Sequence, residues 1–283
     1  MSTPSRARHP TEDSPWTKAL VLGVVVAFLL LVLILPMVTV FFEALRRGVQ
    51  PALDAIAQPD AVAAIKLTLI TAAITVPFNV FFGVCAAWAV AKHEFPGKSL
   101  LITLIDLPFS VSPVVAGLIY VLVFGAQGWF GEWLIDHDIK IIFAIPGIVL
   151  ATIFVTFPFV ARELIPLMQE QGVDEEEAAV SLGASGLRTF WSVTAPNIRW
   201  GLLYGVLLCN ARAMGEFGAV SVVSGHIRGI TNTMPLHVEI LYNEYDFVGA
   251  FSVAGLLCML AILTLILKAL LEVFQPQSRR VGH

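Results

Sequence analysis

Long apolar segments alternate with shorter polar intervals along almost the whole chain. Six of these segments are long enough to cross a membrane as helices, which takes about 20 residues each. They cover residues 17–42, 61–91, 99–124, 141–161, 201–223 and 248–271. Backbone groups in lipid must pair within their own segment, and these segments are too long for barrel strands. The pattern therefore predicts an all-α polytopic membrane protein with about six transmembrane helices.

Composition agrees with a chain surrounded by lipid. Of the 283 residues, 57% are hydrophobic and 13% are charged, and the mean hydropathy is +0.83. A soluble protein has about 25% charged residues, so most of this chain must face membrane lipid or other apolar helices. The net charge of −4 and the lack of a dense basic patch exclude a nucleic-acid partner. Cys85, Cys209 and Cys258 lie singly inside apolar segments, which predicts packed thiols rather than disulfides or a metal site.

The polar intervals divide the chain into regions. Residues 1–16 are polar and Pro-rich and are predicted to form a disordered N-terminal tail. Residues 17–60 hold the first span and an outer loop. Residues 61–272 hold the other spans and one long polar interval at 162–200, and residues 273–283 form a C-terminal tail. A short interval at 125–140 contains Trp129 and Trp133, which predicts one interfacial turn.

Lysine and arginine residues near the span ends indicate the orientation, because they concentrate on the cytoplasmic side of a membrane. With the N-terminus inside, the larger set is cytoplasmic and comprises Arg6, Arg8, Lys18, Lys92, Lys98, Arg162, Arg188, Arg199, Lys268, Arg279 and Arg280. The smaller, outer set comprises Arg46, Arg47, Lys66, Lys140 and Arg228. Both termini and the interval 162–200 are therefore predicted to be cytoplasmic, although the adjacent pair Arg46-Arg47 opposes this assignment.

The interval 162–200 predicts two short helices joined by a turn. Four consecutive acids begin at Asp174, and acids at a helix start complement the positive end of the helix dipole. The first helix is expected to end at Gly183, a residue suited to a left-handed C-terminal turn. Apolar positions at helical spacing between Leu187 and Thr194 predict a second, amphipathic helix. Pro196 is expected to block its continuation into the next span.

The spacing of Glu177-Ala178-Ala179, Gly183 and Pro196 resembles the EAA loop of bacterial ABC importer permeases. Val193 and Ala195 stand where that family usually has Ile and Leu. The resemblance implies that this loop docks onto a cytoplasmic ATPase, whereas composition alone favours a merely solvated acidic face. No phosphate-binding loop sequence occurs in the chain. ATP and Mg would therefore be bound by a separate ATPase, and this chain would have no cofactor of its own and no catalytic residue.

Two opposite charges lie in the middle of the fifth apolar segment. Arg212 and Glu216 are four residues apart and therefore share one helical face. A lone charge at that depth costs about 2.5–3.5 kcal/mol on insertion scales. Two interpretations stay open: an ion pair that only fixes packing, or a part of an anion path or its gate.

The third apolar segment contains two prolines, Pro108 and Pro113, which interrupt helical hydrogen bonding. They predict a kinked helix that either lines a cavity, with Ser110 and Ser112 as anion donors, or is kinked for structural reasons alone. Asp106 lies near the predicted cytoplasmic end of this segment and would repel an anion, so we expect it to cap or gate rather than to bind.

Longer strings at 95–97, 106–117, 157–164, 196–200, 210–219 and 218–229 resemble the permease subunits of bacterial sulfate/thiosulfate ABC importers. The family often has Ser where this chain has His226. The resemblance implies a type I ABC importer permease fold with residues 61–272 as its core, in the bacterial inner membrane. It also implies a heterodimer with a homologous second permease subunit, two ATP-binding subunits and a periplasmic sulfate/thiosulfate-binding protein.

Three alternatives remain at this point. Within the family, a molybdate permease shares the pattern around Arg212, and nothing in composition or spacing identifies sulfate. An ion-coupled secondary carrier would usually show internal pseudo-repeats, and none is evident in the sequence. A membrane enzyme would need convergent histidines, cysteines or paired carboxylates, whereas the six histidines of this chain are dispersed.

Overall fold

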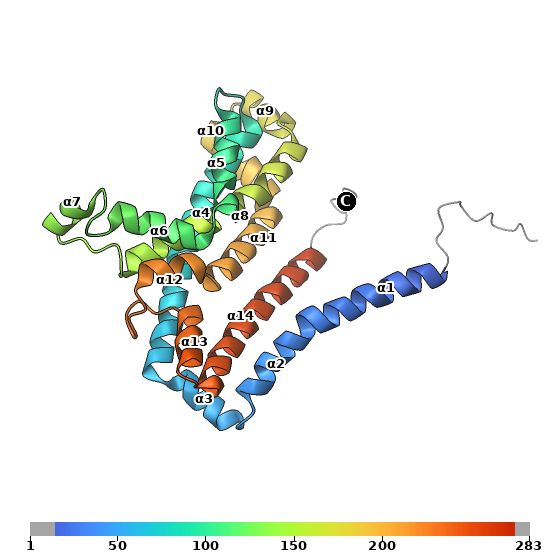
Figure 1. Ribbon diagram of the computed structural model, residues 1–283. Helices are drawn as coiled ribbons and strands as arrows, with labels where there is room; N and C mark the ends of the chain where they lie inside the picture. Colours follow the sequence, from blue (N-terminus) through green and yellow to red (C-terminus); the bar gives the residue numbers. More distant parts are fainter. Residues whose placement is uncertain (1–14, 275–283) are drawn as a thin grey trace, which may run out of the picture.

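The computed structural model describes residues 15–274, and every regular element within that range is helical (Figure 1). The helices are α1 (Pro15–Leu29), the π-helical η1 (Leu30–Ile34), α2 (Leu35–Ala44), α3 (Val49–Ala57), α4 (Pro59–Lys92), α5 (Lys98–Ser110), α6 (Pro113–Phe124), α7 (Gly131–Asp136), α8 (Ile145–Gln171), α9 (Asp174–Ser181), α10 (Gly186–Thr189), the π-helical η2 (Phe190–Thr194), α11 (Ala195–Met214), α12 (Gly218–Ser224), α13 (Met234–Asn243) and α14 (Phe247–Phe274). The predicted tails lie mostly outside the described residues.

Four of the six predicted spans are continuous helices in the part of the chain that is described. They are Trp16–Ala44, which joins α1, η1 and α2, then Pro59–Lys92, Ile145–Gln171 and Phe247–Leu270. The predicted end of the span at 141–161 is wrong, because helix α8 does not stop at Ala161. It continues through Pro166 to Gln171. The predicted loop therefore begins about three helical turns later.

The other two predicted spans are bent pairs of helices. The segment 99–124 divides into α5 and α6, which meet at 107°. Pro113 cannot donate a backbone hydrogen bond and restricts the residue before it, so Val111 and Ser112 are extended and end α5. The expectation of one kinked helix is wrong here. The segment 201–223 likewise divides into α11 and α12, with a bend of 49° after Met214.

Pro196 does not end the helix that precedes it. A continuous helix runs from Gly186 to Met214, and Pro196 lies in the first turn of α11, directly after the π-helical turn η2. The wider turn accommodates the missing N–H donor and the bulk of the ring. The second short helix of the polar interval is therefore continuous with the span that follows. The turn predicted in the interval 125–140 is present as the short helix α7, which contains the exposed Trp133 and follows the exposed Trp129.

Helices α4, α8 and α11 form the centre of the molecule. Buried side chains between them include Ala87, Val160, Leu164 and Ile198. Helix association in lipid depends on close packing, and glycines allow it. A Cβ atom on Gly83 of α4 would lie 2.9 Å from Cβ of Val160 in α8. The close contact between α4 and α8 at this point therefore requires glycine, because any side chain would clash with Val160.

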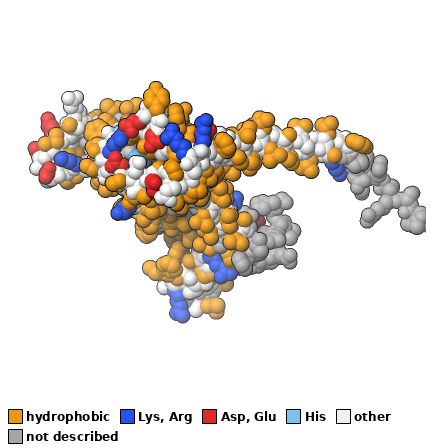
Figure 2. Space-filling view, turned by 90° about the horizontal axis from the view of Figure 1, so that it is seen from below, with side chains coloured by type: hydrophobic (Ala, Val, Ile, Leu, Met, Phe, Trp, Pro, Cys, Tyr) orange, Lys and Arg blue, Asp and Glu red, His pale blue; other side chains and the backbone are white. Residues whose placement is uncertain are grey.

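Helix α1 stands apart from this centre. Figure 1 shows α1 extending away from the other helices, while α2 continues beside α14. None of the most apolar part of the span Trp16–Ala44 is buried. Hydrophobic side chains cover the arm that α1 forms in Figure 2. A surface of this kind needs lipid or another apolar helix around it.

Candidate functional site

Helix α9 begins and ends as its local sequence predicts. Its first turn consists of Asp174, Glu175, Glu176 and Glu177, which favour the positive end of the helix. Gly183 then adopts a φ of +88°. Its N–H donates to the carbonyl of Val180 at 2.9 Å, and the N–H of Ala184 donates to the carbonyl of Ala179 at 3.0 Å. This pair of bonds is a Schellman C-cap, which turns the chain from α9 into α10.

We call residues 174–194 the knob, which lies at one end of the helical centre, around the labels α9 and α10 in Figure 1. Its surface combines acids with unusually exposed apolar side chains. Leu182 is 89% exposed, Leu187 is 74% exposed and Trp191 is 66% exposed. Glu177 and Ala178 are also exposed. Such an apolar surface rimmed by charge is typical of a protein-binding site.

The knob is fixed to the span helices through Lys92, a contact that the sequence analysis missed. The ammonium of Lys92, at the end of α4, lies 2.9 Å from Oε1 of Glu176 and also donates to the carbonyl of Gly172. The same Glu176 oxygen accepts a hydrogen bond from Thr194 at 3.1 Å. The Lys92 side chain is only 6% exposed. One buried cation thus joins α4 and the residue that follows α8 to the knob.

Replacing Lys92 with methionine is expected to loosen the knob. Glu176 would lose its charged partner, and removing one partner of a buried ion pair costs about 3–5 kcal/mol. Limited proteolysis of the membrane-embedded protein should therefore cleave the variant faster within the knob. The matched control is Lys98→Met, because Lys98 pairs with Glu94, which is 89% exposed, and exposed pairs contribute about 0–1 kcal/mol. Equal cleavage of both variants would contradict this role of Lys92.

The structure pairs the two intramembrane charges. Arg212 Nη1 lies 2.6 Å from Oε2 of Glu216. Glu216 is almost fully buried, whereas the Arg212 side chain is 34% exposed. The second carboxylate oxygen of Glu216 accepts the backbone N–H of Ala219 at 2.9 Å. Glu216 was predicted to lie within the fifth span helix, but it lies in the break between α11 and α12. Its charge there also complements the start of α12.

The two helix breaks lie against each other. A Cβ atom on Gly218 would lie 2.9 Å from Cβ of Pro113, and one on Gly117 would lie 2.7 Å from the carbonyl oxygen of Ala219. Helix α6 therefore packs on α12 through two glycines. Ser110 and Ser112 are exposed at the break between α5 and α6. Among the described contacts, none joins these serines to Arg212, so the structure brings the two breaks together but not the predicted side chains.

Other polar groups in the spans have structural partners. Arg162 in α8 donates two hydrogen bonds, of 2.6 and 2.7 Å, to the carboxylate of Asp106 in α5. The sequence analysis expected Asp106 to cap or gate and did not find this partner. It also missed a buried cluster in which Asn79 Nδ2 donates to Thr156 Oγ1 at 2.7 Å and lies 3.6 Å from Sγ of Cys209.

The prediction of packed thiols holds for Cys209, which is buried, but is wrong for Cys85, which is exposed on α4. An apolar sequence context cannot distinguish a helix face that meets lipid from one that meets protein.

Two residues of the polar loop after α12 lie close to carboxylates of the helix that follows and its end. Arg228 pairs with Glu244, and Nδ1 of His226 lies 3.8 Å from the carboxylate of Glu239. His237 in α13 is buried, and burial lowers the pKa of its imidazole. Within residues 15–274, no group of three His, Cys, Asp or Glu side chains lies close enough to hold a metal ion.

Sequence comparison finds relatives along nearly the whole chain. The protein is 53% identical to the sulfate transport system permease protein CysW of Synechocystis sp., over 94% of each chain. It is 51% identical to CysW of Escherichia coli K12, over 94% of this chain and 91% of the other. It is also 36% identical to the sulfate transport system permease protein CysT of E. coli K12, over 86% of this chain and 88% of the other.

Structural comparison confirms the predicted fold. A chain in the crystal structure of a bacterial alginate ABC transporter, in complex with alginate pentasaccharide-bound periplasmic protein, matches with a TM-score of 0.74. The match covers 94% of this chain and 95% of the other at 15% identity, which shows the fold alone. The sequence model of the family of binding-protein-dependent transport system inner membrane components matches residues 79–280 of this chain. With its bent spans and its knob, this chain therefore belongs to the family of inner membrane components of binding-protein-dependent transport systems.

Proposed function

We propose that the chain is a permease subunit of an ATP-driven importer that carries sulfate, and with it thiosulfate, across the bacterial inner membrane. The observation that carries the proposal is the 51–53% identity, over 94% of the chain, to permeases named for sulfate transport. These relatives favour sulfate over molybdate as the oxyanion. The chain itself would not be an enzyme, because ATP hydrolysis would take place in a separate partner.

The knob is the proposed contact with that ATPase. Glu177, Ala178 and Ala179 lie on α9, and Gly183 ends it with the turn described above. The exposed apolar side chains of the knob would be covered by the partner on docking. Lys92 would then transmit a movement of the knob directly to α4 and α8, because it holds all three together. Pro196 would contribute through the helix that joins the knob to α11 without interruption.

The two helix breaks are the proposed part of the translocation path. Arg212 is partly exposed and would attract a dianion, while Glu216 neutralises most of its charge. A path of this kind admits an anion without holding it tightly, which transport requires. Ser110 and Ser112, exposed at the neighbouring break, would supply hydroxyl donors. Tight capture would be left to a periplasmic binding protein.

The assembly would be a heterodimer of this chain with a homologous permease, bound to two ATP-binding subunits. The similarity of this chain to both CysW and CysT supports a pair of related permeases. The exposed helix α1 offers an apolar surface that a second permease could cover. Both termini would be cytoplasmic, as the charge distribution predicts.

Purification from host membranes in mild detergent tests the assembly. We expect a second permease and an ATPase to co-purify, and the purified complex in vesicles to take up labelled sulfate only with ATP. A chain that purifies alone, from membranes known to express such an ATPase, would contradict the proposal and favour an ion-coupled carrier. Uptake of molybdate but not sulfate would contradict the substrate alone.

Charge reversal at Glu177 tests the docking role of the knob. Glu177→Lys is expected to reduce ATP-driven uptake at least about tenfold, which corresponds to about 1.4 kcal/mol of lost coupling. The side chain is exposed, so folding should not change. Asp174→Lys is the control, because it makes the same charge change on another exposed acid of the same turn. Equal loss in both variants would show that only the net charge of the knob matters.

A further inference from the structure

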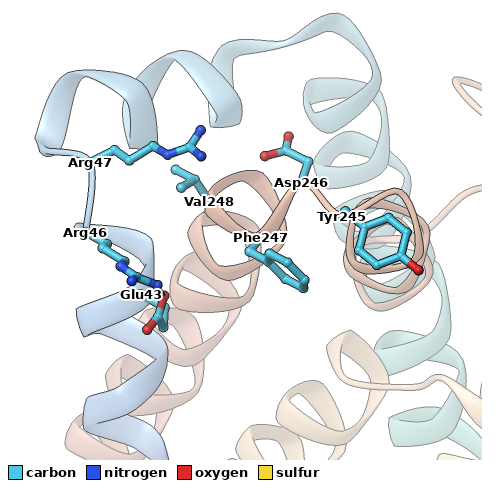
Figure 3. A pocket seen from close by; sticks show the side chains of 7 residues that line it. All are labelled: Glu43, Arg46, Arg47, Tyr245, Asp246, Phe247 and Val248. Atoms are coloured by element: carbon cyan, nitrogen blue, oxygen red, sulfur yellow. Dashed lines mark hydrogen bonds and ion pairs between the residues drawn. The ribbon is translucent and has the colours of Figure 1, made fainter.

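A polar pocket lies between the ends of two spans, well away from the knob and the helix breaks. It has a volume of about 400 Å³, within the range of about 300–1,000 Å³ that is usual for small-ligand sites. Figure 3 shows the seven residues that line it, which are Glu43, Arg46, Arg47, Tyr245, Asp246, Phe247 and Val248. They come from the end of α2, the turn that follows it, the turn that precedes α14, and the start of α14.

The position of the pocket along the spans sets its depth in the membrane. One span ends at Ala44, and Arg46 and Arg47 follow it after one residue, Leu45. The other span begins at Phe247, on the wall of the pocket. The pocket therefore lies where the hydrocarbon layer ends and lipid headgroups begin.

The charges of the pocket are balanced but only partly paired. Arg46 Nη1 lies 3.3 Å from Oε2 of Glu43, and its side chain is still 68% exposed. Arg47 reaches over Val248 toward Asp246 in Figure 3, yet the structure records no ion pair between them. Two guanidinium groups and two carboxylates thus surround one cavity, with Arg47 and Asp246 facing each other across a gap.

The turn that places Asp246 is backbone-strained. Tyr245, a bulky residue, has a φ of +64°, a region that such side chains rarely occupy. Asp246 then accepts the N–H of Gly249 at 3.1 Å and so caps α14. Strained backbone of this kind is concentrated at functional sites in proteins.

We propose that the pocket binds the headgroup of phosphatidylethanolamine from the outer leaflet of the membrane. The phosphate would contact Arg46 and Arg47, whose guanidinium groups match phosphate geometry. The primary ammonium would contact Glu43 and Asp246. A ligand with a phosphate alone would add negative charge beside two carboxylates, so the charge set fits a zwitterion better than an anion. The arginine pair that opposes the positive-inside distribution thereby has a role in the outer leaflet.

Native mass spectrometry of the purified complex, with the partners that accompany it, tests this proposal. The complex is stripped of lipid and then given phosphatidylethanolamine or phosphatidylglycerol. Phosphatidylethanolamine is expected to be retained about tenfold better, an effect of roughly one charge-assisted hydrogen bond. Excess inorganic phosphate should leave the bound lipid in place. Equal retention of the two lipids, or displacement by inorganic phosphate, would overturn the proposal and indicate a simple anion site.

Three variants locate the site. Arg47→Gln is expected to lose most of the bound lipid, whereas Lys140→Gln, which removes an exposed cation from the same predicted side but outside the pocket, should not. Glu43→Gln should leave phosphatidylglycerol binding intact and abolish the preference for phosphatidylethanolamine. Such a change of preference cannot come from misfolding, and its absence would overturn the proposal. Because the readout is lipid retention, the result is independent of whether the complex transports sulfate.

Discussion

A Gly183→Val variant is expected to reach the membrane in normal amounts, yet its rate of sulfate uptake should fall about tenfold or more. Gly183 has a φ of +88°, and an L-residue in this left-handed region costs about 1–2 kcal/mol, more when it is β-branched. The Schellman bonds to Val180 and Ala179 would weaken, and the angle between α9 and α10 would change. The knob would then present its exposed apolar side chains in the wrong arrangement. ATP-driven uptake and the yield of co-purified ATPase measure the effect.

Gly186→Val is the matched control for this variant. Gly186 lies three residues further along the same knob, and a Cβ atom on either glycine would meet nothing within 4 Å. Only Gly183 needs a positive φ. An effect of added bulk alone would therefore lower uptake in both variants, whereas loss of the turn would lower uptake only in Gly183→Val. Equal uptake by the two variants would show that the conformation of Gly183 does not matter for coupling.

Local signals explain why the knob could be predicted so closely. Four acids at the start of α9 and a glycine at its end act within a few residues of each other, so neither depends on the rest of the fold. The predicted start at Asp174 is confirmed, and the helix ends at Ser181, two residues before the predicted Gly183, which forms the C-cap turn. Pro196 was misjudged because its effect depends on the preceding turn, and a π-helical turn is not visible in the sequence.

The bend of 107° between α5 and α6 illustrates what the sequence could not give. Pro113 predicts a break, but the size of the bend depends on what α6 packs against. Here Gly117 and Gly218 allow α6 to lie directly on α12, so the geometry depends on glycines about 100 positions apart in the chain. The contact of Lys92 likewise depends on a distant residue, because its partner Glu176 lies in a different polar interval. Long-range pairs of this kind leave no periodic pattern.

The ion pair of Arg212 and Glu216 predicts an asymmetric pair of single variants. Arg212→Ala leaves an almost fully buried carboxylate without its partner, and breaking a buried pair in this way costs about 3–5 kcal/mol. Glu216→Ala leaves a cation that is 34% exposed, so we expect a smaller loss. The yield and thermal stability of the purified complex measure both losses. Equal losses would contradict the burial difference on which the prediction rests.

The double variant Arg212→Ala/Glu216→Ala separates packing from transport. With both charges removed, no unpaired charge remains in the membrane, so complex yield should recover toward that of Glu216→Ala, although the N–H of Ala219 still lacks its acceptor. If the pair only fixed packing, uptake would recover together with yield. We expect uptake to stay low, because the double variant lacks the partly exposed cation beside the two helix breaks that would receive the dianion. Recovery of both quantities would remove Arg212 from the proposed path and leave the ion pair as a structural feature.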